Sequence, residues 1–95
     1  MVIPRVVRDH NSKTAILFKE GRKFVHYIPM KSGKLTVKRL PLARFYSMYE
    51  DASIDVVRAA QTYMNHGGGI TEAVRTALQE ILTEEKHEDN RDGTI

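Results

Sequence analysis

The chain of 95 residues contains no cysteine, so disulfide bonds, thiolate catalysis and cysteine-ligated zinc are all excluded. It also lacks any run of about 18 apolar residues, the length that a membrane-spanning helix needs. Pro4, Arg5 and Arg8 interrupt the apolar residues at the N-terminus, which is unlike a secretory signal peptide. We therefore expect a soluble protein that does not bind a membrane and acts in the cytoplasm.

Sequence signatures of catalysis and metal binding are equally scarce. The four histidines are His10, His26, His66 and His87. Their spacing does not match that of a zinc site. There is no Gly-x-Ser-x-Gly motif, and neighbouring carboxylates such as Glu50 and Asp51 point apart, which makes a poor pair for acid–base catalysis. We predict a protein that is not an enzyme and has no catalytic residues, no metal and no cofactor.

Charge is distributed unevenly along the chain. Residues 1–49 hold eleven Lys/Arg and two acidic residues, whereas residues 50–95 hold four Lys/Arg and ten acidic residues. The formal net charge of +3 conceals this division. A strongly basic half attracts an anionic partner, so the two halves are expected to present surfaces with different roles.

The first forty residues have the composition of β-strands. β-prone runs cover residues 2–8, 14–18, 23–30 and 34–40. Gly21 can take the positive φ of a tight hairpin between the second and third runs. Along the third run, Ile28 should face the opposite side of the sheet from Val25 and Tyr27. These features predict an antiparallel meander of three to four strands.

The second half of the chain has helical periodicity. Pro41 ends the last strand, and its fixed φ suits the start of a helix. Apolar residues then recur at helical spacing over residues 42–49, 56–64 and 70–82. Ser53 and Thr71 are the predicted N-caps of the second and third helices.

Together the two patterns predict a single α+β domain over residues 1–82, with a basic β part (1–40) and a helical part (41–82). We expect two to three helices packed on one face of the sheet. Gly67-Gly68-Gly69 is interpreted as a flexible turn between the last two helices. Residues 83–95 are strongly charged and are predicted to form an acidic, disordered tail.

The best candidate for a functional site is a set of basic side chains from consecutive turns and strand ends. These are Arg22, Lys23, Lys31, Lys34, Lys38, Arg39 and Arg44. The loops of a meander lie close together, so we expect the seven to form one patch. Lys and Arg neutralise phosphates, and nearby aromatic residues can stack on bases, which predicts a nucleic-acid interface. The alternative is that the aromatic residues are core and the lysines protect strand edges.

The helix, glycine turn and helix permit a second interpretation. Residues 69–78 resemble the recognition-helix segment of winged helix-turn-helix repressors. Residues 71–78 are also similar to the second helix of ribbon-helix-helix repressors, and residues 34–41 to their DNA-reading strand. However, Arg58 and Arg75 are the only basic residues on the two predicted helices, which does not favour a groove-binding face.

Over residues 14–82 the chain resembles short accessory proteins encoded by phages of actinobacteria. The similar features are the strand end Val37–Pro41, the aromatic segment Phe45–Tyr49, and a glycine turn followed by an Ala/Leu helix. The resemblance implies a non-enzymatic regulator or host-takeover factor in the host cell cytoplasm and transfers no functional residues. Two partners remain open: nucleic acid, or an acidic surface of a host protein whose activity the chain modulates. A homodimer would also help so small a core.

Overall fold

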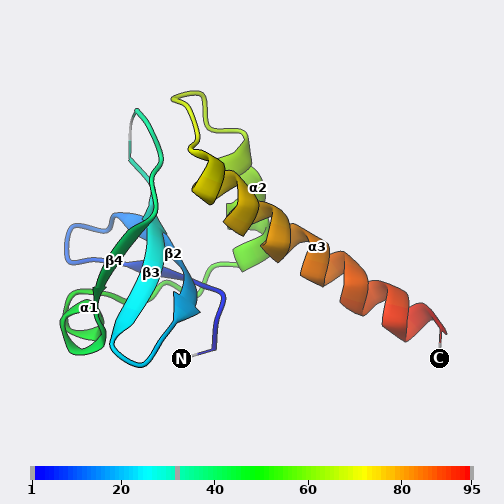
Figure 1. The fold of residues 1–95 in the computed structure, drawn as a ribbon, viewed down its shortest axis with the longest axis horizontal. Coiled ribbons are helices and arrows are strands. Elements are labelled where there is room, and N and C mark those ends of the chain that lie inside the picture. Colours follow the sequence, from blue (N-terminus) through cyan, green and yellow to red (C-terminus); the bar gives the residue numbers. More distant parts are fainter. Residues whose placement is uncertain (1, 32, 95) are drawn as a thin grey trace.

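Five antiparallel strands form one sheet in the order β4-β3-β2-β1-β5 (Figure 1). This computed structural model describes the backbone of residues 2–31 and 33–94, and the side chains of residues 2–31 and 33–83. The strands are β1 (Arg5–Arg8), β2 (Thr14–Glu20), β3 (Phe24–Pro29), β4 (Lys38–Pro41) and β5 (Glu50–Asp51). The helices are α1 (Leu42–Met48), α2 (Val56–Met64) and α3 (Glu72–Thr94). The predicted α+β class and antiparallel meander are confirmed, and β5 is an additional strand.

Helices cover both faces of the sheet. On one face, Val6, Ile16 and Ile28 form a buried cluster with Tyr63 of α2 and Leu78 of α3. On the other face, the buried cluster is composed of Val7, Ala15, Leu17, Val25, Tyr27 and Phe45. The predicted alternation along β3 is confirmed, since Ile28 belongs to the first cluster and Val25 and Tyr27 to the second.

The prediction that the helices pack on one face of the sheet is therefore wrong, because α1 lies on the face opposite to α2 and α3. Phe45 of α1 is fully buried against the second face, where its ring lies 5.1 Å from that of Tyr27 and stacks on Tyr49 at 4.6 Å. The backbone amide of Leu42 donates to the carbonyl of Lys23, which fixes the start of α1 at the β2–β3 turn. A helix that starts there can reach the face opposite to α2 and α3 (Figure 1).

A β-bulge at Phe18 changes which side chains of β2 lie on the side of α2 and α3. Leu17 pairs with Tyr27 and Lys19 pairs with His26, so Phe18 is the extra residue. Cross-strand partners point to the same face of a sheet. The bulge consequently brings both Phe18 and Lys19 to the side of α2 and α3, next to His26.

The glycine turn before α3 is attached to the β3–β4 loop. The amide of Leu35 donates to the carbonyl of Gly69, and Leu35 itself is completely buried in the α2–α3 core. The turn also approaches the loop closely at Gly68, where an added Cβ would lie 1.9 Å from the carbonyl oxygen of Gly33. Figure 1 shows the loop and the turn extending side by side from the same end of the molecule. The turn is therefore held in place by packing, in contrast to the flexible connection expected from its composition.

The ends of the helices are only partly as predicted. Thr71 caps α3, because its hydroxyl accepts from the amide of Val74 at 3.2 Å. Asp55, and not Ser53, caps α2, since the Asp55 carboxylate accepts from the amide of Arg58 at 3.0 Å. α3 continues to Thr94. The side chains of residues 84–95 lie outside what is described, and the predicted disordered tail at 83–95 stays a prediction. No described helix has both the length and the apolarity that crossing a membrane requires.

Candidate nucleic-acid interface

All seven of the predicted basic residues are exposed, and they lie along and beyond one edge of the sheet. Arg22 and Lys23 form the β2–β3 turn, Lys31 and Lys34 belong to the β3–β4 loop, Lys38 and Arg39 lie on β4, and Arg44 lies on α1. β4 is the outermost strand on this side. We call these seven residues, together with Lys13, the basic edge.

Strand register determines how the basic edge is ordered. Lys38 pairs with Tyr27 near the loop end of β3, and Pro41 pairs with Phe24 near the turn end. The four residues of β4 extend over about 10 Å at about 3.3 Å per residue. That length corresponds to about three phosphates of one DNA strand at about 3.4 Å each. The basic edge is therefore a strip with a cationic group at each end and Arg39 between them.

Three lysines converge at the loop end of this strip. The amide of Met30 donates to the carbonyl of Thr14 at 2.9 Å, which places Lys13 and Lys31 next to each other. Hydrogen bonding with Lys38 and repulsion from its amine, then desolvation and repulsion from Lys13, lower the pKa of Lys31 below its usual value. Like charges this close repel one another, and an anion bound between them would relieve that repulsion.

The sequence interpretation missed Lys13. This residue precedes β2 directly, so the register of the β2–β3 hairpin brings it opposite the end of β3. In the sequence, Lys13 is recognisable only as a basic residue that precedes a predicted strand. Its position near Lys31 depends on pairing between segments that are far apart in the chain.

At the turn end, one acidic side chain lies beside the basic residues. Glu20 accepts a hydrogen bond from the hydroxyl of Tyr46 on α1. Burial, followed by this contact, raises the pKa of Tyr46 to about 12. Glu20 is thus occupied with α1, and Arg22, Lys23 and Arg44 form no ion pair with any of the described side chains.

The opposite edge of the sheet has a different electrostatic character. Arg5 pairs with Asp51 at 2.6 Å, and Arg8 pairs with Glu50 at 3.4 Å, across β1 and β5. Hydrogen bonds from Arg5 and from the backbone of Ser53 lower the pKa of Asp51 to about 2. The basic residues at this edge are therefore neutralised, whereas no described carboxylate pairs with the basic edge at β4.

The aromatic residues near the basic edge fall into two groups. Tyr27 and Phe45 are buried in the core on the α1 face, so they cannot stack on a base. Phe18 and Phe24 are only half-buried and lie on the other face. The guanidinium of Arg39 lies 4.8 Å from the centre of the Phe24 ring, a cation–π contact. The ring of Phe18 lies 6.4 Å from that of His26.

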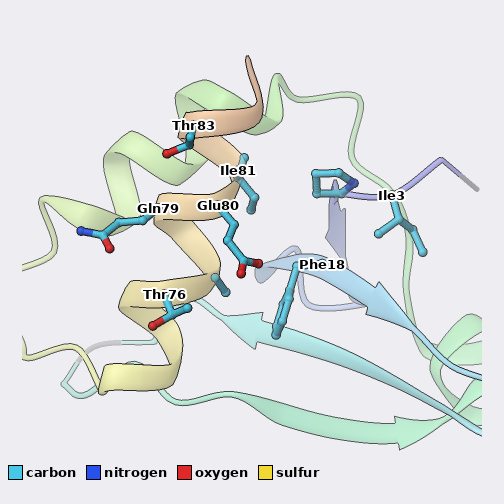
Figure 2. Close-up of a pocket in the computed structure, with 9 residues that line it drawn as sticks. Ile3, Phe18, Thr76, Gln79, Glu80, Ile81 and Thr83 are labelled. Atoms are coloured by element: carbon cyan, nitrogen blue, oxygen red, sulfur yellow. The ribbon is translucent and has the colours of Figure 1, made fainter. Parts of the chain in front are cut away.

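A groove separates α3 from this part of the sheet. It consists of two adjoining hollows, with cavity volumes of about 560 and 570 Å³. Both hollows are lined by Phe18 from β2 and by Thr76, Ala77 and Glu80 from α3, and His26 lines the second. Figure 2 shows the ring of Phe18 and the carboxylate of Glu80 approaching each other across the first hollow. We call this feature the α3 groove.

The described part of the chain offers little for metal chemistry. Among residues 2–31 and 33–83, no three His, Asp or Glu side chains come together as a metal ion would require. His66, which follows α2, lies against the carbonyl of Gly33, and His26 lies on β3.

Comparisons with known proteins identify no relative of this chain. A scan of protein-family models finds no match, and searches of the curated proteins and of the solved structures find none either. The resemblance to actinobacterial phage proteins therefore stays a prediction. The basic edge and the α3 groove are the observations from which function has to be inferred.

Proposed function

We propose that the basic edge binds the phosphate backbone of a nucleic acid, and that the protein is a small non-enzymatic accessory protein of the phage type, acting in the host cytoplasm. The observation that carries this proposal is the difference between the two edges of the sheet. Arg5 and Arg8 are paired with carboxylates at the β5 edge. At the β4 edge, Lys31 and Lys38 lie beside each other without a carboxylate partner among the described side chains.

Charge at the rest of the surface supports a single binding orientation. Glu72 and Glu80 are exposed on α3, and Asp55 is exposed at the start of α2. Glu72 and Glu80 also line the α3 groove. These carboxylates repel a phosphate backbone, so the phosphates would lie at the β4 edge, away from α3 and from the start of α2. Neutralising phosphates also releases their counterions, which makes the predicted affinity strongly dependent on salt.

The test is the salt dependence of nucleic-acid affinity in a pair of matched variants. Lys31→Gln combined with Lys38→Gln removes two charges from the basic edge. Arg58→Gln combined with Arg75→Gln removes two charges from exposed positions on α2 and α3. The first variant should weaken binding at least about tenfold at low salt and reduce the slope of log K against log salt by about 1.4–1.8, whereas the control should change neither.

Two results would reject the proposal. One is the absence of binding by the unmodified protein to single- or double-stranded DNA or RNA at about 50 mM salt. The other is an equal loss of affinity in the two double variants, because net charge alone would then explain binding.

A protein partner is the alternative that a separate observation favours. β4 is an edge strand, so an extended acidic segment of a host protein could add to the sheet there, or a second copy of the chain could form a homodimer. Stoichiometric recovery of one host protein after nuclease treatment would support this alternative. DNA recognition by α2 and α3, as in helix-turn-helix or ribbon-helix-helix repressors, would instead make Arg58 and Arg75 the critical residues.

A further inference from the structure

The face of the sheet that α2 and α3 cover is left partly open next to β4. Phe18, Phe24 and His26 are half-buried on this face, and Arg39 is exposed at its edge. Figure 1 shows α3 crossing away from β3 and β4 toward the far side of the molecule. A row of rings thus lies beside the basic edge, and two of them, Phe18 and His26, line the α3 groove.

Register places these rings in a line across three strands. His26 on β3 pairs with Lys19 on β2 and with Arg39 on β4. Phe18 lies next to His26 on one side, and the Arg39–Phe24 contact lies on the other. Neighbouring strands are about 4.8 Å apart, so the line extends over about 10 Å. Flat rings at this spacing can serve as a stacking surface for bases, and an Arg guanidinium contributes to such stacking.

The other wall of the groove has polar groups suited to the edges of bases. Glu80 projects from α3 toward Phe18 (Figure 2), and Thr76 lines both hollows. A carboxylate excludes phosphates from the groove but accepts hydrogen bonds from the amino groups of bases. Lys19 lines the second hollow, whereas the residues of the basic edge lie outside the groove. Phosphates at the basic edge and bases in the α3 groove would satisfy both sets of charges.

We propose that the nucleic acid bound by this protein is single-stranded, with bases stacked on Phe18 in the α3 groove and on Phe24 beside it, while the phosphates follow the basic edge. This inference rests on the proposed function. In a duplex the bases are paired and already stacked, so they are not available to protein rings. The stacking surface would therefore contribute nothing to duplex binding.

The experiment compares four fluorescent probes by anisotropy with the full-length protein. The probes are a DNA single strand and an RNA single strand of about 12 nucleotides, a duplex of the same length, and an abasic strand that keeps only sugar and phosphate. We expect both single strands to bind at least about tenfold more tightly than the abasic strand and the duplex. The ratio of DNA to RNA affinity then tells which of the two sources of single strands is preferred.

Substitutions of the aromatic rings test whether the bases stack on them. Phe18→Leu combined with Phe24→Leu keeps apolar side chains but removes the rings, and should weaken single-strand binding about tenfold while leaving the abasic strand unaffected. Tyr49→Leu removes a half-buried ring on the α1 face and should change neither. Circular dichroism checks that the variants fold. If the double variant does not fold, the comparison of the four probes on the unmodified protein still tests the stacking inference.

The outcomes separate this inference from the proposed function. Equal affinity for the single strand, the duplex and the abasic strand would overturn the stacking inference while supporting phosphate binding by the basic edge. Absence of binding to every probe at low salt would overturn both.

Discussion

Two adjacent glycines give a sharp test of how the β3–β4 loop is held in place. A Cβ at Gly68 would lie 1.9 Å from the carbonyl oxygen of Gly33, whereas a Cβ at Gly67 would have no neighbour within 4 Å. Gly68→Ala must therefore push the loop and the glycine turn apart, and overpacking of this kind costs about 1–3 kcal/mol. The hydrogen bonds of Leu35 with Gly69 and Thr71 are worth about 1 kcal/mol each and would be weakened as well.

We expect Gly68→Ala to lower the free energy of unfolding by about 2–4 kcal/mol, measured by urea denaturation with circular dichroism. Gly67→Ala should leave it unchanged or raise it by about 0.4–1 kcal/mol, because alanine restricts the unfolded chain. In a thermal melt, the first variant should lose about 10 °C or more. Equal stability of the two variants would refute the contact between Gly68 and Gly33, and with it the account of how the β3–β4 loop is held against the glycine turn.

Two further predictions concern the core and the β5 edge. Leu35→Ala should cost about 3 kcal/mol in urea denaturation, since this side chain is completely buried, whereas Leu40→Ala at a half-buried position should cost about 1 kcal/mol; equal costs would contradict the burial of Leu35. Asp51 should titrate near pH 2, below its ordinary value of 3.8, in a carboxyl NMR titration, and Arg5→Gln should raise that midpoint. Because the pKa is lowered in the folded state, the stabilising contribution of Asp51 is fully present above about pH 4 and is lost as the pH falls through about 2.

Periodicity made much of the fold predictable. Alternation around Val25, Tyr27 and Ile28 identified β3 and its two faces, because side chains on a strand point alternately to opposite sides. Pro41 marked the change from strand to helix, and the hydroxyl of Thr71 caps α3. These are local properties that depend on one residue and its immediate neighbours in the chain.

The features that the sequence did not reveal depend on distant segments. Ser53 and Asp55 are both good capping residues, and only the path of the backbone decides that Asp55 caps α2. β5 is two residues long and forms through pairing with β1, so its strand character is not visible in its own sequence. The side of the sheet that α1 covers is likewise set by where Phe45 finds a buried position.

The candidate site was likewise only partly predictable from the sequence. Composition identified the seven basic residues of the predicted patch, and all seven are exposed. The sequence did not show that Lys13 lies near Lys31, because strand register brings these two residues together. Nor could it separate the buried Tyr27 from the half-buried Phe24, although both lie on β3.

The most direct test of the central claim is a ¹H–¹⁵N NMR titration of the protein with a short oligonucleotide at low salt. Binding by the basic edge predicts that the largest backbone shifts occur at Lys31, Lys38 and Arg39, with small shifts at the β5 residues Glu50 and Asp51. Shifts concentrated at the β5 edge or on the outer surface of α2 and α3, or no shifts at all, would contradict it.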